Sequence, residues 1–309
     1  MRNILYFAVI LLITFSCQTS SQDNESNKAM NADEKADSIK QIENEEVGYY
    51  ADSADIAIYD KLIKYAHDNQ LENRRIAEIE LAIAQQLYGT PYVGHTLEKD
   101  SVESLIVNLR ELDCTTFMEN VVALAICIKR NTTRFNDFCD MLVKLRYRDG
   151  HIDGYPSRLH YTTDWLVDNQ QKGLIKIVSN DFGPADFDSK VNFMSTHPES
   201  YVQLSNPKFV EAMKEHEARI SAYKLKLVPK DKIDELSKNI MGGDIVALST
   251  KIDGLDFSHV TLAAWHNGKL HFIHASSKDK KVELSDKTLQ EYLVGMKNND
   301  GIVVARLVE

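Results

Sequence analysis

The sequence has no basic patch. Its 309 residues include 46 acidic and 36 basic side chains, which give a net charge of −10 at pH 7. Proteins that bind DNA or RNA need clustered lysines and arginines to neutralise the phosphate backbone. The charge pattern therefore excludes nucleic acid as a partner. There is also no internal repeat, and no low-complexity tract beyond the acidic segment at residues 18–51.

After its first residues the sequence lacks an apolar run long enough to cross a bilayer. At the start, MRNILYFAVILLITFSC has Arg2, an apolar stretch over residues 4–15, and Ser16 before Cys17. The stretch is too short to span a membrane and is typical of an export signal. It resembles a bacterial lipoprotein signal, which implies lipidation of Cys17, although Thr14 stands where leucine is usual. The alternative is an ordinary cleaved secretory signal.

These features predict three segments. Residues 1–17 form the lipoprotein signal peptide, and residues 18–51 form a flexible acidic tether. From 18 to 50 there are eight acidic residues and three lysines, with few apolar residues to offset the entropy of ordering. Residues 52–309 form the folded domain, with an insertion near 131–235. We expect an exported lipoprotein, held at the membrane of a bacterial cell envelope (periplasm or outer membrane) through the lipid anchor only.

Cysteines are few, and their number limits pairing. If Cys17 is lipidated, Cys114, Cys127 and Cys139 remain, so at least one thiol stays free. Cys114 and Cys127 are separated by about 20 Å along one predicted helix, which is beyond disulfide reach. Cys127 lies in the apolar run VVALAIC and is expected in the core. Cys139 could pair with Cys127 or stay buried.

The hydrophobic pattern has a helical period in the first part and alternates in the last third. This order predicts the α+β class, with the helix after Cys114 packed on an antiparallel sheet. Asp52 or Ser53 is expected to cap the first helix, and residues 151–205 are expected to form loops with short strands. Helices are predicted over 52–69, 74–89, 115–130, 135–147 and 206–225, and strands over 244–250, 258–266, 269–276 and 301–308.

Cys114 stands in LDCTTF, where Asp113 or a threonine can cap the helix that follows. The N–H groups of a helix N-terminus stabilise a thiolate, lower the pKa of a cysteine and can bind an oxyanion. Cys114 is therefore a candidate nucleophile, and the alternative is a small core residue. A nucleophile of this kind also needs a base.

Two histidines, His259 and His274, supply that base. A hairpin centred on Asn267 would place them opposite each other on adjacent strands, so that one acts as base and the other orients it. The alternatives are a metal site or plain surface, but no third and fourth ligands stand at suitable spacing. We therefore expect no metal and no other cofactor. His266 and His271, beside the turn, are expected to face solvent.

Four motifs occur in an order that resembles the NlpC-type cell-wall cysteine hydrolases, which are papain-like enzymes. They are GTPYVG (89–94), LDCTTF (112–117), GGDIVAL (242–248) and SHVTLAAWHNGKLHFIHASS (258–277). The resemblance implies a papain-like core in which an antiparallel sheet packs on the helix that carries the cysteine. It departs from the usual family pattern at Asp-Cys-Thr-Thr, where Asp-Cys-Ser-Gly is usual, and at His-Val-Thr, where His-Val-Gly is usual.

The resemblance also implies roles for single residues. Cys114 matches the nucleophile, His259 the base and His274 the orienting residue. Tyr92 matches a tyrosine that assists the oxyanion or the substrate, although a core aromatic is an equal alternative. Further substrate-binding candidates lie beside the motifs or in the insertion, where a structural loop is the alternative: Asp113, Arg158, His160, Tyr161, Asp164 and Ser258.

The segments NLRELDCTTFMEN and SRLHYTTDWLVDN resemble the amidase-like branch of this family. That branch implies cleavage between N-acetylmuramic acid, in some members its 1,6-anhydro form, and L-alanine of the stem peptide. The expected partner is thus peptidoglycan or a muropeptide, and Arg158 could hold a stem-peptide carboxylate. The alternatives are an endopeptidase that cuts between D-glutamate and the diamino acid, and a non-catalytic surface-binding lipoprotein.

Overall fold

The computed structural model describes residues 49–98 and 102–309, so Cys17, the signal peptide and nearly all of the predicted tether lie outside the described residues. The helices are α1 (Ser53–Asp68), α2 (Ile76–Gln86), α3 (Cys114–Lys129), α4 (Phe135–Arg146), α5 (Thr162–Gln171), α6 (Ser179–Phe182), α7 (Phe193–Thr196), α8 (Pro207–Ile220), α9 (Ile233–Leu236) and α10 (Leu289–Val294). The strands are β1 (Tyr49–Ala51), β2 (Leu105–Val107), β3 (Ile175–Ile177), β4 (Ala185–Phe187), β5 (Leu225–Pro229), β6 (Ile245–Ser249), β7 (Phe257–His266), β8 (Lys269–Ser276), β9 (Lys281–Leu284) and β10 (Gly301–Leu307). Within these ranges no helix is both long and apolar enough to cross a membrane.

An antiparallel sheet forms the centre of the fold. Its strand order is β4-β5-β10-β6-β7-β8-β9, and β3 also pairs with β10. Successive side chains of β6 point to opposite faces, as strand geometry requires. Ile245 and Ala247 contribute to the larger core, whereas Val246 and Leu248 contribute to a second core with α9 and α10. The mixed helices and sheet agree with the predicted α+β class.

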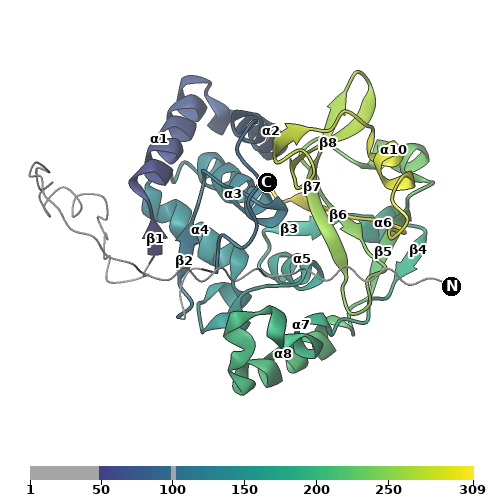
Figure 1. Cartoon of the computed structure of the whole chain (residues 1–309). Coiled ribbons are helices and arrows are strands. Elements are labelled where there is room, and N and C mark those ends of the chain that lie inside the picture. The colour runs from purple at the N-terminus through teal and green to yellow at the C-terminus, as the bar shows by residue number, and fades with distance from the viewer. Residues whose placement is uncertain (1–48, 99–101) are drawn as a thin grey trace, which may run out of the picture. The chain divides into compact units, whose positions relative to one another are not determined.

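Helix α3 packs against β7 and β8 on one side and against α2 and α4 on the other, as Figure 1 shows. Asp113 begins this helix through a capping box with Thr116. Every residue from Thr116 to Ile128 is buried, because the helix is enclosed by the sheet and the other helices. Burial on all sides fixes the position of its first residue, Cys114, relative to the sheet.

The Gly-Gly-Asp motif brings β6 close to α2. Gly243 has a φ of +93°, and a Cβ at this position would lie 2.9 Å from the carbonyl oxygen of Ala77. Only glycine fits this combination without strain. The buried carboxylate of Asp244 then accepts hydrogen bonds from the N–H of Met241 at 2.7 Å and from Nε of Arg306 at 2.7 Å. The motif therefore holds the strand next to the one that carries His259.

The prediction of loops and short strands for residues 151–205 is wrong at α5. This helix has no apolar stripe, because nearly all of its faces are buried. Its polar side chains are bound inside the protein: Asp164 pairs with Arg148 at 2.6 Å, and the Asn169 amide donates to the Leu145 carbonyl at 2.9 Å. A pattern search for one apolar face misses a helix of this kind.

Candidate active site

Cys114 is the first residue of α3, and its backbone N–H has no hydrogen-bond partner among the described residues. Oδ1 of Asp113 accepts the Thr116 N–H at 2.8 Å, while Oγ1 of Thr116 accepts the Asp113 N–H at 2.9 Å. The candidate Asp113 is thus used as the helix cap. This cap leaves the thiol half-buried at the end of the helix, with a free donor beside it.

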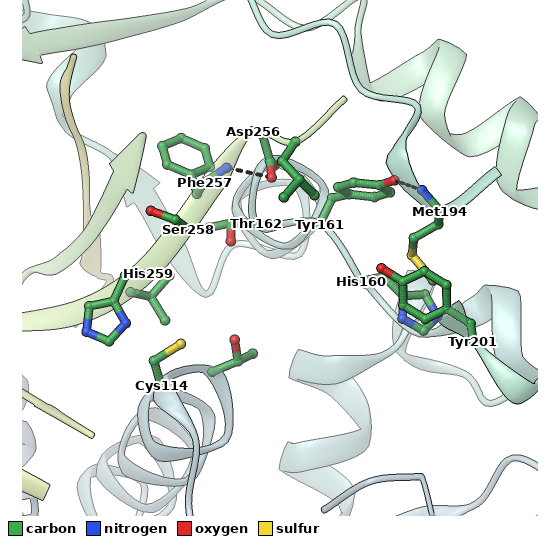
Figure 2. Close-up of a pocket in the computed structure, with 13 residues that line it drawn as sticks. Cys114, His160, Tyr161, Thr162, Met194, Tyr201, Asp256, Phe257, Ser258 and His259 are labelled. Carbon is green, nitrogen blue, oxygen red and sulfur yellow. Dashed lines mark hydrogen bonds between the residues drawn. The ribbon is translucent and has the colours of Figure 1, made fainter. Parts of the chain in front are cut away.

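A pocket of about 150 Å³ opens at Cys114. Cys114 and His259 lie at one end of the group of residues that line it, and His160, Tyr161, Met194 and Tyr201 lie at the other, as Figure 2 shows. The walls come from the start of α3, the segment before α5, the helix α7 and the start of β7. Residues that are far apart in the chain are therefore combined in one site.

His259 and His274 form a hydrogen-bonded pair. Nε2 of His259 lies 2.8 Å from Nδ1 of His274, and the two rings meet edge to face. The predicted pairing register is wrong by two residues: Leu262 pairs with Ile273, so the two histidines are diagonal neighbours and not direct partners. Because side chains alternate along a strand, a shift of two keeps both rings on the same face, where they still touch.

The sulfur of Cys114 lies next to the strand that carries His259. The backbone N–H of Val260, the residue after His259, interacts with this sulfur, as do the N–H and hydroxyl of Thr115. Cys114 and His259 also line the same pocket. The structure therefore brings together the predicted nucleophile, the predicted base and the predicted orienting residue.

The predicted low pKa of the thiol is wrong. Burial, with a smaller contribution from the neighbouring carboxylate of Asp113, raises the pKa of Cys114 to about 11. The N–H groups at the helix N-terminus act in the opposite direction but are outweighed by the loss of solvent. Burial also lowers the pKa of His259 to about 3 and that of His274 to about 4. These shifts favour the uncharged forms of the thiol and of both imidazoles in the free protein.

Tyr92 lies beside the start of α3 and outside the pocket lining. It bridges to Leu112, two residues before Cys114. Burial raises the pKa of Tyr92 to about 12, and the charges of Cys114 and Asp113 contribute, which places the phenol near the sulfur. Ser258, by contrast, is exposed on β7 and lines the pocket.

The insertion candidates divide into two groups. His160 and Tyr161 reach the pocket, where Nε2 of His160 lies 2.9 Å from the Tyr155 carbonyl oxygen. Arg158 and Asp164 do not line it. Arg158 is 5% exposed and pairs with Glu98 and Glu103, each at 3.0 Å, while Asp164 pairs with Arg148. Their charges are used inside the protein, so the structure does not support a substrate carboxylate on Arg158.

Sequence reasoning missed several residues of the site. Asp256 lines the pocket and accepts the N–H of Thr163 and of Phe257, each at 2.7 Å, which ties β7 to α5. Tyr292 of α10 packs against Phe272 and His274, with ring centroids 5.0 and 6.1 Å apart. Met194 and Tyr201 complete the far wall. No sequence spacing links these positions to Cys114, because only the folded chain brings them close.

The two histidines beside the β7–β8 turn differ in their exposure. His271 is buried, with Nδ1 2.9 Å from the Ser285 carbonyl oxygen, so the prediction that it faces solvent is wrong. His266 is exposed, as predicted.

Cys127 and Cys139 are buried and unpaired, which confirms the core position of Cys127. Residues 49–98 and 102–309 contain no group of three potential metal-ligating side chains.

A thiol at a helix start, a histidine pair and an adjoining pocket define a site suited to nucleophilic attack on an acyl group. The comparison with known families agrees with this chemistry. The chain belongs to the AmiA-like family, described as N-acetylmuramoyl-L-alanine amidase-like, which matches residues 82–302. The match is to this amidase-like family, and the wider NlpC-type, papain-like placement stays a prediction.

Solved structures with the same fold include an N-acetylmuramoyl-L-alanine amidase from Bacteroides uniformis. It is 38% identical, covers 76% of this chain and 99% of its own, and has a TM-score of 0.73. A protein from Bacteroides fragilis, described as a putative xylanase, is 40% identical over 72% of this chain and 99% of its own, with a TM-score of 0.70. A Legionella pneumophila protein is 20% identical over 83% of this chain and 95% of its own, at a TM-score of 0.63, and shares the fold. No curated protein matches the chain.

Proposed function

We propose that the protein is a cysteine-dependent N-acetylmuramoyl-L-alanine amidase. It hydrolyses the amide between the lactyl group of N-acetylmuramic acid, in its ordinary or 1,6-anhydro form, and L-alanine of the stem peptide. One observation carries this proposal: Cys114 and His259 line one pocket, and His259 is hydrogen-bonded to His274 at 2.8 Å, in a chain of the amidase-like family.

The neutral resting state makes His259 a general base. A neutral imidazole carries one N–H. When His259 donates from Nε2 to Nδ1 of His274, its own Nδ1 is unprotonated and can take a proton. As sulfur attacks the lactyl carbonyl carbon, the thiol proton passes to this Nδ1. A preformed thiolate–imidazolium pair is not required.

The remaining steps use the same groups. The free N–H of Cys114 stabilises the oxyanion, and the nearby Tyr92 supports it. The C–N bond breaks as His259 returns its proton to the alanine nitrogen, which leaves a thioester on Cys114. Water then loses a proton to His259 and attacks the thioester carbonyl carbon. The bond between the carbonyl carbon and the sulfur breaks, and N-acetylmuramic acid leaves with a free carboxylic acid group. His259 returns its proton to the sulfur of Cys114.

Digestion of purified muropeptides, followed by mass spectrometry, tests this function. The wild-type protein should release the intact stem peptide, whereas Cys114→Ser and His259→Ala should lose activity by about 10³-fold or more. The matched control is Cys139→Ala, which removes a buried thiol that does not line the pocket and should remain active. Unchanged activity of Cys114→Ser would contradict the mechanism. A shortened stem still attached to the sugar would indicate an endopeptidase, and no cleavage at all would indicate a binding protein.

A further inference from the structure

The site has two parts with different charge. The thirteen described residues that line the pocket include no lysine or arginine. One of them, Asp256, is a buried acid, and the Tyr161 hydroxyl in the same wall donates to the buried Glu217 carboxylate at 2.7 Å. A carboxylate that entered this pocket would meet neutral and acidic groups and no positive side chain. The pocket therefore suits an uncharged group that presents hydroxyls and apolar faces.

The other part of the site lies at Tyr92 and the turn between β8 and β9. The Tyr92 N–H donates to the Lys280 carbonyl at 2.9 Å, and the N–H of Gly89 donates to the Val282 carbonyl at 2.9 Å. These bonds add the segment that contains Tyr92 to the edge of β9. Because Tyr92 also bridges to Leu112, the turn is fixed relative to Cys114.

Lys280 places a positive charge beside Tyr92. Its Nζ lies over the Tyr92 ring, 5.8 Å from the ring centroid. Among the described residues no acidic side chain is within ion-pair distance of it, whereas Lys281 pairs with Glu283 at 3.4 Å and Asp279 is bound to Ser276. Lys280 also has a φ of +60°, a conformation that glycine or asparagine adopts more readily. The backbone geometry therefore does not explain a lysine at this position.

We propose that Lys280 binds the first free carboxylate of the leaving stem peptide, that of D-glutamate, while the uncharged sugar occupies the pocket. This inference rests on the proposed function. In the stem that carboxylate lies about two residue lengths, or about 7 Å, from the scissile nitrogen. The Lys280 ammonium lies over the Tyr92 ring, so a peptide that leaves Cys114 in the direction of Tyr92 would carry this carboxylate toward it. The same charge distribution disfavours the reverse orientation, because the carboxylate would then enter the pocket that lacks a positive side chain.

The test compares two substrates that differ only in this charge. They are N-acetylmuramoyl-L-alanyl-γ-D-glutamyl-L-lysine and its α-amide, N-acetylmuramoyl-L-alanyl-D-isoglutaminyl-L-lysine, in both of which the γ-carboxyl group is joined to lysine. The wild-type protein should have a KM roughly tenfold lower for the acid, since a charge-assisted contact of this size is lost with the amide. Lys280→Gln should raise KM for the acid to that of the amide, and any change in kcat through the neighbouring Tyr92 ring should be the same for both substrates.

Two variants control for indirect effects. Lys278→Gln removes a charge from the same turn but not from the Tyr92 ring, and should keep the preference for the acid. Lys280→Arg should keep it as well. Equal KM values for both substrates in the wild-type protein, or an equal loss with both in Lys280→Gln, would overturn the inference while the amidase activity stands. No cleavage of either substrate by the wild-type protein would overturn the proposed function, and this inference with it.

Discussion

Nε2 of His259 lies 2.8 Å from Nδ1 of His274, although the two residues are diagonal neighbours on β7 and β8. His274 packs against Phe272 and Tyr292, whose rings meet the His274 ring at 4.8 and 6.1 Å between centroids. This packing fixes the plane of His274. Since a hydrogen bond needs one donor, His274 in turn decides which nitrogen of His259 is free to accept a proton.

Loss of this second ring should reduce turnover more than binding. His274→Ala removes the acceptor for His259, and we expect kcat to fall by about 10²-fold or more with little change in KM. His274→Gln, which keeps an acceptor oxygen near the position of Nδ1, should restore part of the loss. Steady-state kinetics on a muropeptide measures both constants. The exposed His266→Ala is the matched control, and equal kcat values for it and His274→Ala would contradict the role of His274.

The reactivity of the thiol should depend on Asp113. Because burial and the Asp113 carboxylate raise the pKa of Cys114 to about 11, the rate of iodoacetamide alkylation should rise about tenfold per pH unit from pH 7 to 10. Asp113→Asn removes the negative charge but keeps a capping oxygen, so it should lower the pKa and speed alkylation at pH 8. Glu111→Gln, an exposed neighbour, should leave the profile unchanged. A plateau at or below pH 7 in the wild-type protein would show a preformed thiolate.

Acid should destabilise the fold through the histidine pair. Burial lowers the pKa of His259 to about 3 and that of His274 to about 4, below the usual 6.5. Between these values and 6.5 the unfolded chain binds more protons than the folded protein. The free energy of unfolding should therefore fall as pH falls below 6.5, by up to about 1.4 kcal/mol per pH unit for each group.

Urea denaturation from pH 7 to pH 4 measures this dependence. His259→Gln should have a flatter profile than the wild-type protein, because one buried group no longer titrates. His266→Gln removes an exposed histidine and should reproduce the wild-type slope. Parallel profiles for all three proteins would mean that the pair does not control acid stability.

Export and anchoring are proposals that follow from the N-terminal sequence. We propose that Cys17 is lipidated and holds the domain at the membrane of the cell envelope. Cys17→Ser should abolish incorporation of labelled fatty acid and move the protein from the membrane to the soluble fraction, with full activity in the purified domain. Equal fatty-acid labelling of Cys17→Ser and the wild-type protein would exclude this cysteine as the attachment site.

Local sequence patterns determined much of the fold around the site. Apolar residues at helical spacing predicted α1, α2, α4 and α8, and short apolar segments between turns predicted β6, β7, β8 and β10. Strand β6 is buried on both faces, because a core lies on each side of the sheet. The same patterns failed for α5, whose partners cover it on nearly every side. They also failed for Arg158 and His271, because whether a polar side chain meets solvent or an internal partner depends on segments distant in the chain.

The sequence by itself determined that Cys114 begins a helix and that His259 and His274 share one face of a hairpin, since both follow from local periodicity. Only the tertiary structure decided that these residues meet at a pocket, that Asp256 and Tyr292 support it, and that the thiol has a high pKa. The physical reason is that desolvation and electrostatic potential at an atom sum over all neighbouring segments. The short motif around that atom contributes only part of the sum.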